Sequence, residues 1–83
     1  MPESQVKDIM ELMETVINDP SIPKNIRKNV LEARDRLAGN EDLAAKVSSA
    51  IHSIEEISED INMPMHARTQ IWTIMSALES MKK

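Results

Sequence analysis

The sequence predicts an all-α fold, an antiparallel four-helix bundle built from two tandem helical hairpins. The main observation is an internal repeat, because residues 6–37 resemble residues 47–78 at a constant offset of 41 positions (47 − 6 = 41). Identical residues recur at Val6/Val47, Glu14/Glu55, Asp19/Asp60, Pro23/Pro64, Arg27/Arg68 and Leu37/Leu78. Each copy has the hydrophobic period of a helix, then a short turn containing proline, then a second helix, so we expect two similar hairpins.

The composition is that of one small domain covering residues 1–83, with 41% hydrophobic residues available for a modest core. The chain contains no cysteine, so no disulfide, thiolate metal site or thiol nucleophile is expected. There is no run of roughly 18 apolar residues and no signal-like start, so we expect no membrane span and a cytoplasmic protein. A net charge of −4 argues against general nucleic-acid binding.

The first hairpin begins with a predicted helix over about residues 3–18, whose apolar residues recur on one face. Pro20 cannot continue its hydrogen-bond ladder. The second predicted helix covers about residues 22–38, with Ser21 as its cap and Pro23 in its first turn. Gly39, the single glycine, is expected to end this helix with a positive φ.

The second hairpin repeats this pattern. Its first helix is expected to start from an Asn40 cap and to end near Asp60. Asn62 stands where Ser21 stands in the first copy, and Pro64 falls in the first turn of the last helix. That helix turns a stripe inward, consisting of Ala67, Ile71, Ile74, Leu78 and Met81. Short connections predict that neighbouring helices are antiparallel.

Charge alternates between the predicted helices. The first and third are acidic, and the second and fourth are basic. Exposed ion pairs contribute only about 0–1 kcal/mol each, so we interpret the alternation as a device that selects which helices pair with each other.

Arg27 and Arg68 each follow a proline by four residues and an aspartate by eight. One interpretation is an anion site near helix N-termini. The other is structural: each arginine folds back onto its turn and bonds both the aspartate, Asp19 or Asp60, and loose carbonyls at the end of the preceding helix. Recurrence in both copies favours the structural interpretation. We therefore predict that the two turns are built by the same three residue types in each copy: Asp19, Pro23 and Arg27 in the first, and Asp60, Pro64 and Arg68 in the second.

Patterns for metal or catalytic chemistry are missing. Di-iron bundles use Glu-x-x-His pairs, but Ser49 and Met63 stand three residues before His52 and His66. We therefore expect surface histidines, no metal and no cofactor. The acidic run at residues 55–60 is typical of a solvated helix face. With no phosphate-binding glycine loop and no recognisable nucleophile motif, we expect no enzymatic activity.

An apolar strip on the last helix has no place in the predicted core. Trp72 and Met65 lie on the side opposite the buried stripe, and Met75 lies between the two faces. The matching residues in the first copy are Leu31, Lys24 and Arg34. We expect Leu31, Met65, Trp72 and Met75 to form a contact surface for self-association, as a homodimer, or for another protein. The alternative is that Trp72 covers an open end of the core.

The turn strings Asp19-Pro20-Ser21-Ile22-Pro23-Lys24-Asn25-Ile26-Arg27 and Asp60-Ile61-Asn62-Met63-Pro64-Met65-His66-Ala67-Arg68 resemble a small archaeal protein family of unassigned function. The resemblance spans nearly the whole chain and implies a compact four-helix bundle, with no catalytic residues to transfer. The same strings loosely resemble HEAT-type repeats, which have an aspartate in the turn and an arginine early in the second helix. Two copies are few for a solenoid, so a closed bundle is preferred.

A rival function uses the basic second helix to bind small anions or nucleic acid. Its candidate residues are Lys24, Arg27, Lys28, Arg34 and Arg36. This hypothesis predicts tight binding to polyanions that weakens steeply with salt, whereas the protein-contact hypothesis predicts that Trp72→Ala alters association while folding survives.

Overall fold

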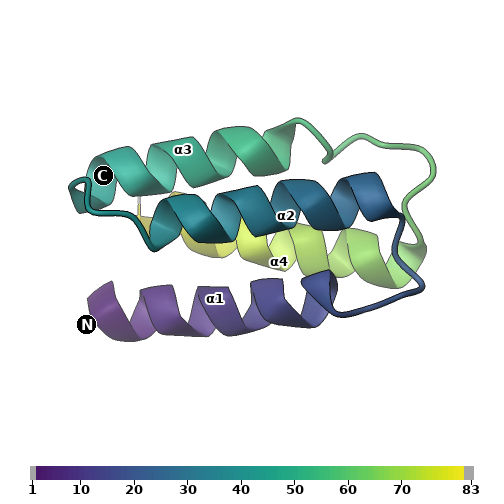
Figure 1. Ribbon diagram of the computed structural model, residues 1–83, viewed down its shortest axis with the longest axis horizontal. Coiled ribbons are helices and arrows are strands. Elements are labelled where there is room, and N and C mark those ends of the chain that lie inside the picture. Colours follow the sequence, from purple (N-terminus) through teal and green to yellow (C-terminus); the bar gives the residue numbers. More distant parts are fainter. Residues whose placement is uncertain (1, 82–83) are drawn as a thin grey trace.

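The computed structural model describes residues 2–81, which form four α-helices connected by loops. The helices are α1 (Pro2–Ile17), α2 (Lys24–Leu37), α3 (Leu43–Glu55) and α4 (Met65–Met81). Successive helices run in opposite directions along a body of 33 × 19 × 19 Å (Figure 1). Lys82 and Lys83, which the sequence assigns to the basic last helix, lie outside the described residues, as does Met1.

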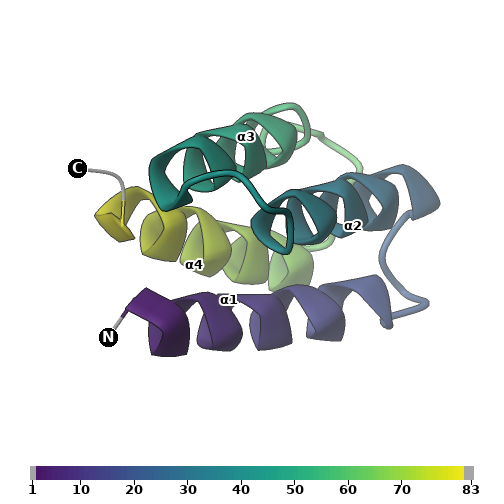
Figure 2. The same ribbon diagram turned by 60° about the vertical axis from the view of Figure 1, so that its left-hand side comes forward.

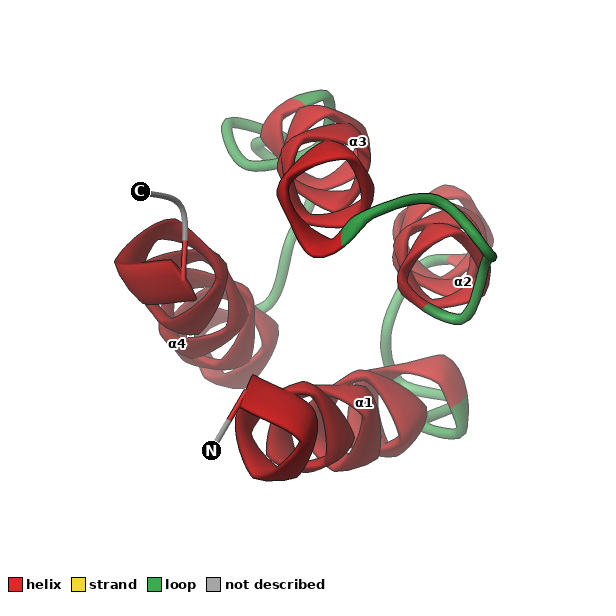
Figure 3. Cartoon of the chain, turned by 90° about the vertical axis from the view of Figure 1, so that its left-hand side faces the viewer, coloured by secondary structure: helices red, strands yellow, loops and turns green. Residues whose placement is uncertain are grey.

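The helices close into a ring. Each helix packs against the next one, and α4 packs against α1, so that α1 faces α3 and α2 faces α4 across the core (Figure 3). Figure 2 shows α1 lying beneath both α2 and α4. The predicted all-α antiparallel four-helix bundle is therefore confirmed, and its two hairpins close on each other rather than forming an open stack.

The core is aliphatic and comes from the inward stripes of all four helices, together with buried residues of the two turns. Burying one such side chain stabilises the fold by about 1.5–3 kcal/mol. Ile22 and Met63 are buried at equivalent positions of the repeat (22 + 41 = 63), and Ile57, just after α3, is buried as well. The fully buried large side chains are Met13, Val16, Ile22, Ile26, Val30, Leu37, Val47, Ile54, Ile71, Ile74 and Leu78.

The two turns have the same local structure, because the repeated residues make the same hydrogen bonds. In the first turn, the backbone N–H of Ser21 donates to Oδ1 of Asp19 at 2.9 Å, and in the second, that of Asn62 donates to Oδ1 of Asp60 at 2.8 Å. The backbone N–H groups of Ile22 and Met63 donate to the carbonyls of the same aspartates, at 3.1 and 3.3 Å. Each aspartate thus organises its turn.

Ser21 and Asn62 are not helix caps, so this detail of the sequence prediction is wrong. α2 starts at Lys24 and α4 at Met65, each directly after its proline. Pro23 flanks α2, and no side chain caps that helix. A proline disfavours helical backbone in the residue before it, so neither helix extends back to the predicted cap.

The connection between the hairpins also differs from the prediction. Asp42, not Asn40, caps α3, and its side chain accepts a hydrogen bond from the backbone N–H of Ala45 at 2.8 Å. Gly39 does not have a positive φ. Its N–H instead donates to the carbonyl of Arg36 at 3.2 Å, a tightened last turn that needs no left-handed residue. α3 ends at Glu55 rather than near Asp60, and consecutive turns follow it.

Candidate protein-interaction surface

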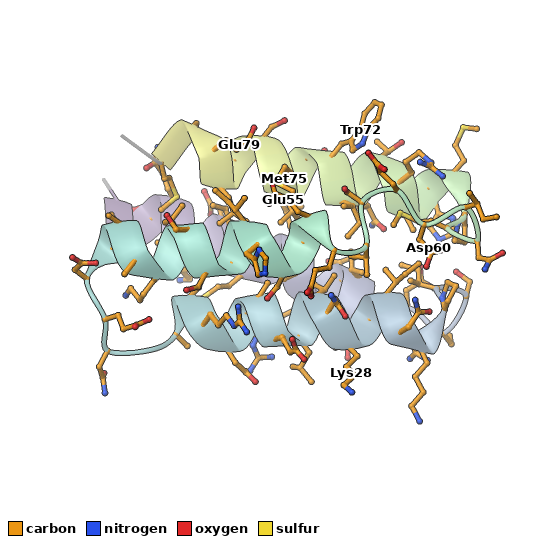
Figure 4. The ribbon with its side chains drawn as sticks, turned by 90° about the horizontal axis from the view of Figure 1, so that it is seen from above. Lys28, Glu55, Asp60, Trp72, Met75 and Glu79 are labelled. Atoms are coloured by element: carbon orange, nitrogen blue, oxygen red, sulfur yellow. The ribbon has the colours of Figure 1, made fainter. Side chains whose placement is uncertain are left out.

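The solvent-facing side of α4 carries two of the exposed large apolar side chains that the structure describes, Met65 and Trp72. We define the α4 outer face as Met65, Thr69, Trp72, Ser76 and Glu79, which are all exposed and alternate in steps of four and three residues. Met65 is 81% exposed and Trp72 is 62% exposed. Within this face Glu79 is the only charged side chain. Trp72 therefore lies outside the core rather than covering an open end of it (Figure 4).

Another exposed apolar residue, which the sequence analysis did not anticipate, lies just before α4. Ile61 is 89% exposed in the turn that leads into this helix. Its counterpart in the first copy is Pro20, so the repeat contains no signal for it. Isolated exposed apolar residues are common in loops, but this one is close in sequence to Met65 on the α4 outer face.

Leu31 is not part of this surface. It lies 39% exposed on α2, where it lines an open groove with Ile17 of α1. We call this groove, formed by Ile17, Lys24, Arg27, Lys28 and Leu31, the basic groove; its volume is about 310 Å³. Because α2 and α4 are diagonal in the bundle, Lys28 and Trp72 point to opposite sides of the molecule (Figure 4). The four predicted contact residues therefore divide between two surfaces.

Met75 occupies a place that holds an ion pair in the first hairpin. There, Arg34 pairs with Glu14, joining α2 to α1. The equivalent residues of the second hairpin are Met75 and Glu55 (34 + 41 = 75; 14 + 41 = 55). Met75 is half-buried against the core, and Glu55 is exposed. No cation pairs with Glu55 among residues 2–81.

A serine, a histidine and an aspartate meet where the first turn approaches α4. Nε2 of His66 lies 3.1 Å from Oγ of Ser21 and 3.1 Å from Oδ2 of Asp19. Oγ of Ser21 also donates to Oδ1 of Asp19 at 2.6 Å. A catalytic triad uses different ring nitrogens for the serine and the carboxylate, whereas here one nitrogen contacts both. The cluster thus has the geometry of a turn cross-link and not of a proton relay.

This cross-link has a counterpart in the other half of the molecule. Nδ2 of Asn25, at the start of α2, donates to Oδ2 of Asp60 at 3.0 Å. Asn25 and His66 are equivalent in the repeat (25 + 41 = 66), so each hairpin's turn aspartate contacts the second helix of the other hairpin. The sequence analysis expected contacts within each hairpin, and the exchange between hairpins becomes visible only once the four helices are arranged in space.

Hydrogen bonds to both aspartates favour their charged forms. The pKa of Asp19 lies below its ordinary value, first because of the hydroxyl and then the backbone N–H of Ser21, with a smaller contribution from His66. The pKa of Asp60 is also lowered, first by the backbone N–H of Asn62 and then by the amide of Asn25, with a further contribution from Arg68. The turns are therefore held most firmly when the carboxylates are ionised.

The two turn arginines behave differently. Nη2 of Arg68 donates to the carbonyl of Asp60 at 3.3 Å, which is the fold-back contact expected for both. Arg27 makes no hydrogen bond to Asp19 or to the end of α1. It lines the basic groove instead, and its buried Nε has no hydrogen-bond partner among the side chains described, residues 4–81. His66 occupies the place at Asp19 that Arg27 was expected to fill.

Other potential sites carry little chemistry. A smaller groove of about 170 Å³ between α1 and α4 is lined mainly by apolar atoms around Ile9, Leu12 and Ala77. His52 is exposed on α3, with Nε2 4.0 Å from Oε2 of Glu56. Over residues 4–81, no three histidine, aspartate or glutamate side chains gather closely enough to hold a metal ion. The helices of the same range also lack the length and apolar character needed to cross a bilayer.

Comparison with known proteins places the chain in a family. Residues 1–81 match the model of the uncharacterised protein family UPF0147. This chain belongs to the UPF0147 family. Its relatives include a UPF0147 protein of Methanocaldococcus jannaschii, which is 42% identical over 98% of this chain and 88% of the relative. A UPF0147 protein of Archaeoglobus fulgidus is 34% identical over 95% of this chain and 91% of the relative. The resemblance to an archaeal family of unassigned function is confirmed.

Two crystal structures have the same fold. A UPF0147 protein from Thermoplasma acidophilum superposes with a TM-score of 0.91 at 30% identity, over 96% of this chain and 95% of that one. A protein of unknown function, MMP1188, superposes with a TM-score of 0.95 at 38% identity, over 100% of this chain and 96% of that one. These similarities confirm the helical bundle for this chain and identify no biochemical role.

Proposed function

We propose that this UPF0147 protein is a non-enzymatic interaction domain that self-associates, or binds another protein, through the α4 outer face. The observation that carries this proposal is the exposure of Trp72 and Met65 on a helix whose inward stripe is already complete. Ala67, Ile71, Ile74 and Leu78 fill that stripe, so the core does not need Trp72. Tryptophan and methionine are enriched in protein interfaces, and tryptophan often dominates their binding energy.

The residues around Trp72 support the same proposal. Thr69 and Ser76 are small and uncharged, so covering them costs much less desolvation than covering lysine or glutamate would. By contrast, the exposed side of α2 presents Lys24 and Lys28. The proposal includes a cytoplasmic location, which cell fractionation with an antibody against the chain tests.

Size-exclusion chromatography with light scattering tests the proposal, using wild type, Trp72→Lys and the matched control Ser48→Lys on the exposed side of α3. We expect the wild type to exceed the monomer mass of 9.4 kDa, with a homodimer as the smallest assembly. Trp72→Lys is expected to be a monomer with unchanged helix content by circular dichroism, and Ser48→Lys to behave as wild type. A monomeric wild type together with an unfolded Trp72→Lys would instead assign Trp72 to the stability of the fold, and the proposal would fail.

A second candidate function is anion binding in the basic groove. It is favoured by three cationic side chains, Lys24, Arg27 and Lys28, around one groove. The remaining cations of the predicted basic face are engaged, because Arg34 pairs with Glu14 and Nη1 of Arg36 donates to the carbonyl of Ser49 at 3.3 Å. Titration of a labelled oligonucleotide at several salt concentrations tests this candidate, which requires affinity that falls steeply with salt.

A further inference from the structure

The basic groove and the α4 outer face share three equivalent positions of the repeat, and these positions differ in chemistry. At the repeat offset of 41, Lys24 corresponds to Met65, Lys28 to Thr69 and Leu31 to Trp72. The first hairpin thus surrounds an apolar floor of Ile17 and Leu31 with cations. At the equivalent positions the second hairpin replaces both lysines with uncharged residues and keeps only the arginine, as Arg68. Trp72 replaces Leu31 with a larger apolar side chain, and Glu79 is the charged residue of the α4 outer face.

We propose that the basic groove of one copy receives the α4 outer face of a second copy of this chain. Trp72 lies on the floor formed by Ile17 and Leu31, and Glu79 pairs with Lys24 or Lys28. This inference rests on the proposed function and names its partner. Each half of the contact supplies what the other lacks. Within the part of the chain that the structure describes, no ion pair involves Lys24, Lys28 or Glu79, and the indole of Trp72 is exposed.

The spacing of these residues along their helices fits this contact. Seven residues separate Trp72 from Glu79, and seven separate Lys24 from Leu31, which is about 10 Å in each helix. Suppose that α4 lies antiparallel to α2 of the other copy, with Trp72 opposite Leu31. Glu79 then lies opposite Lys24. The groove volume of about 310 Å³ lies within the roughly 300–1,000 Å³ range of pockets that bind small molecules, so it is large enough for an indole ring.

A symmetric contact between two α4 outer faces explains less. Antiparallel pairing centred on Trp72 places each Glu79 opposite Met65, so no carboxylate finds a cation. It also leaves both basic grooves uncovered. The proposed contact is heterologous and joins surfaces on opposite sides of the molecule (Figure 4). Such contacts propagate into rings or filaments rather than stopping at a dimer, so the mass of the wild type is expected to rise with concentration beyond twice the monomer.

Mixing two variants tests the inference. The groove variant, Lys24→Glu with Lys28→Glu, keeps an intact α4 outer face, and the face variant, Trp72→Ala, keeps an intact groove. The substituted residues are exposed, and acidic residues in the first turn of α2 suit the helix dipole, so both variants are expected to fold. Each alone is expected to be monomeric by light scattering, whereas an equimolar mixture forms a one-to-one dimer.

The other outcomes separate this inference from the function on which it rests. If the groove variant alone associates as the wild type does, the contact is between α4 faces; the inference falls and the proposed function stands. If the wild type is monomeric at every concentration, second-copy binding is refuted in both forms. If the wild type associates but the mixture stays monomeric, the groove is not the receptor and the inference falls.

Charge reversal supplies a second, independent test. Glu79→Lys is expected to weaken wild-type self-association by about tenfold or more, while the control Glu41→Lys, in the loop before α3, has no such effect. To leave one possible contact, the partner of Glu79→Lys also carries Trp72→Ala. Binding of Glu79→Lys to Trp72→Ala with Lys24→Glu and Lys28→Glu is expected to be tighter than its binding to Trp72→Ala alone, which keeps a wild-type groove. Equal binding to the two grooves would overturn the assignment of Glu79 to the groove cations.

Discussion

Replacing Met75 with arginine is expected to build in the second hairpin the ion pair that the first hairpin already has. In that pair, the side chains of Arg34 and Glu14 are 34% and 47% exposed, so solvent screens their attraction. Exposed pairs of this kind contribute about 0.2–1 kcal/mol. The aliphatic part of the new arginine covers the surface that Met75 covers now, so little apolar burial is lost. We therefore expect Met75→Arg to raise the free energy of unfolding by about 0.5 kcal/mol.

Thermal unfolding followed by circular dichroism measures this change at a concentration where the protein is monomeric. For a domain of this size, 0.5 kcal/mol corresponds to a rise in Tm of about 2–4 °C. Adding Glu55→Gln to Met75→Arg is expected to remove the gain, and high salt to reduce it. A loss of stability, or a gain that survives Glu55→Gln, would refute the reasoning that the two hairpins place these residues equivalently.

Three further predictions concern the fold itself. Leu78→Ala, at a fully buried position, is expected to lower the unfolding free energy by about 2–5 kcal/mol in urea titrations, and the half-exposed Leu31→Ala to cost clearly less. Because the pKa values of Asp19 and Asp60 are lowered in the folded state, their ionised carboxylates stabilise the fold at pH values above the unfolded-state pKa of about 3.9. This stabilisation is lost as the pH falls through the folded-state pKa values. A variant with both residues changed to asparagine should therefore lose less stability than wild type on acidification from pH 6 to 3. Gly39→Ala is expected to change the unfolding free energy by less than about 1 kcal/mol. The φ angle of Gly39 is not positive, and the new Cβ would lie 3.3 Å from its nearest neighbour, the carbonyl oxygen of Arg36. A loss of about 2 kcal/mol would instead indicate a left-handed glycine.

The repeat allowed the fold to be predicted, because hydrophobic period and turn chemistry are local properties of the sequence. The inward stripe from Ala67 to Leu78 and its counterpart from Ile26 to Leu37 can be placed from the helical period alone. Helix ends were predicted less well. Several residues near each end can act as caps, and the choice of Asp42 over Asn40 depends on where the chain must enter the bundle.

The candidate site was predicted only in part, because it depends on the arrangement of all four helices. The exposure of Trp72 and Met65 follows from one helix, and the structure shows both exposed. Whether Leu31 joins them depends on α2 and α4 being diagonal, which periodicity does not determine. For the same reason, the exchange that links Asp19 to His66 could not be derived from pairs within one hairpin.

The fluorescence of Trp72 tests the central claim most directly, because the chain has one tryptophan and no tyrosine or phenylalanine. Emission and acrylamide quenching are measured across a dilution series together with the mass from light scattering. If the α4 outer face is the association surface, emission shifts to shorter wavelength and quenching falls over the same concentrations at which the mass rises. A rise in mass with unchanged emission and quenching, or a mass that never exceeds the monomer, would contradict the claim that the protein associates through Trp72.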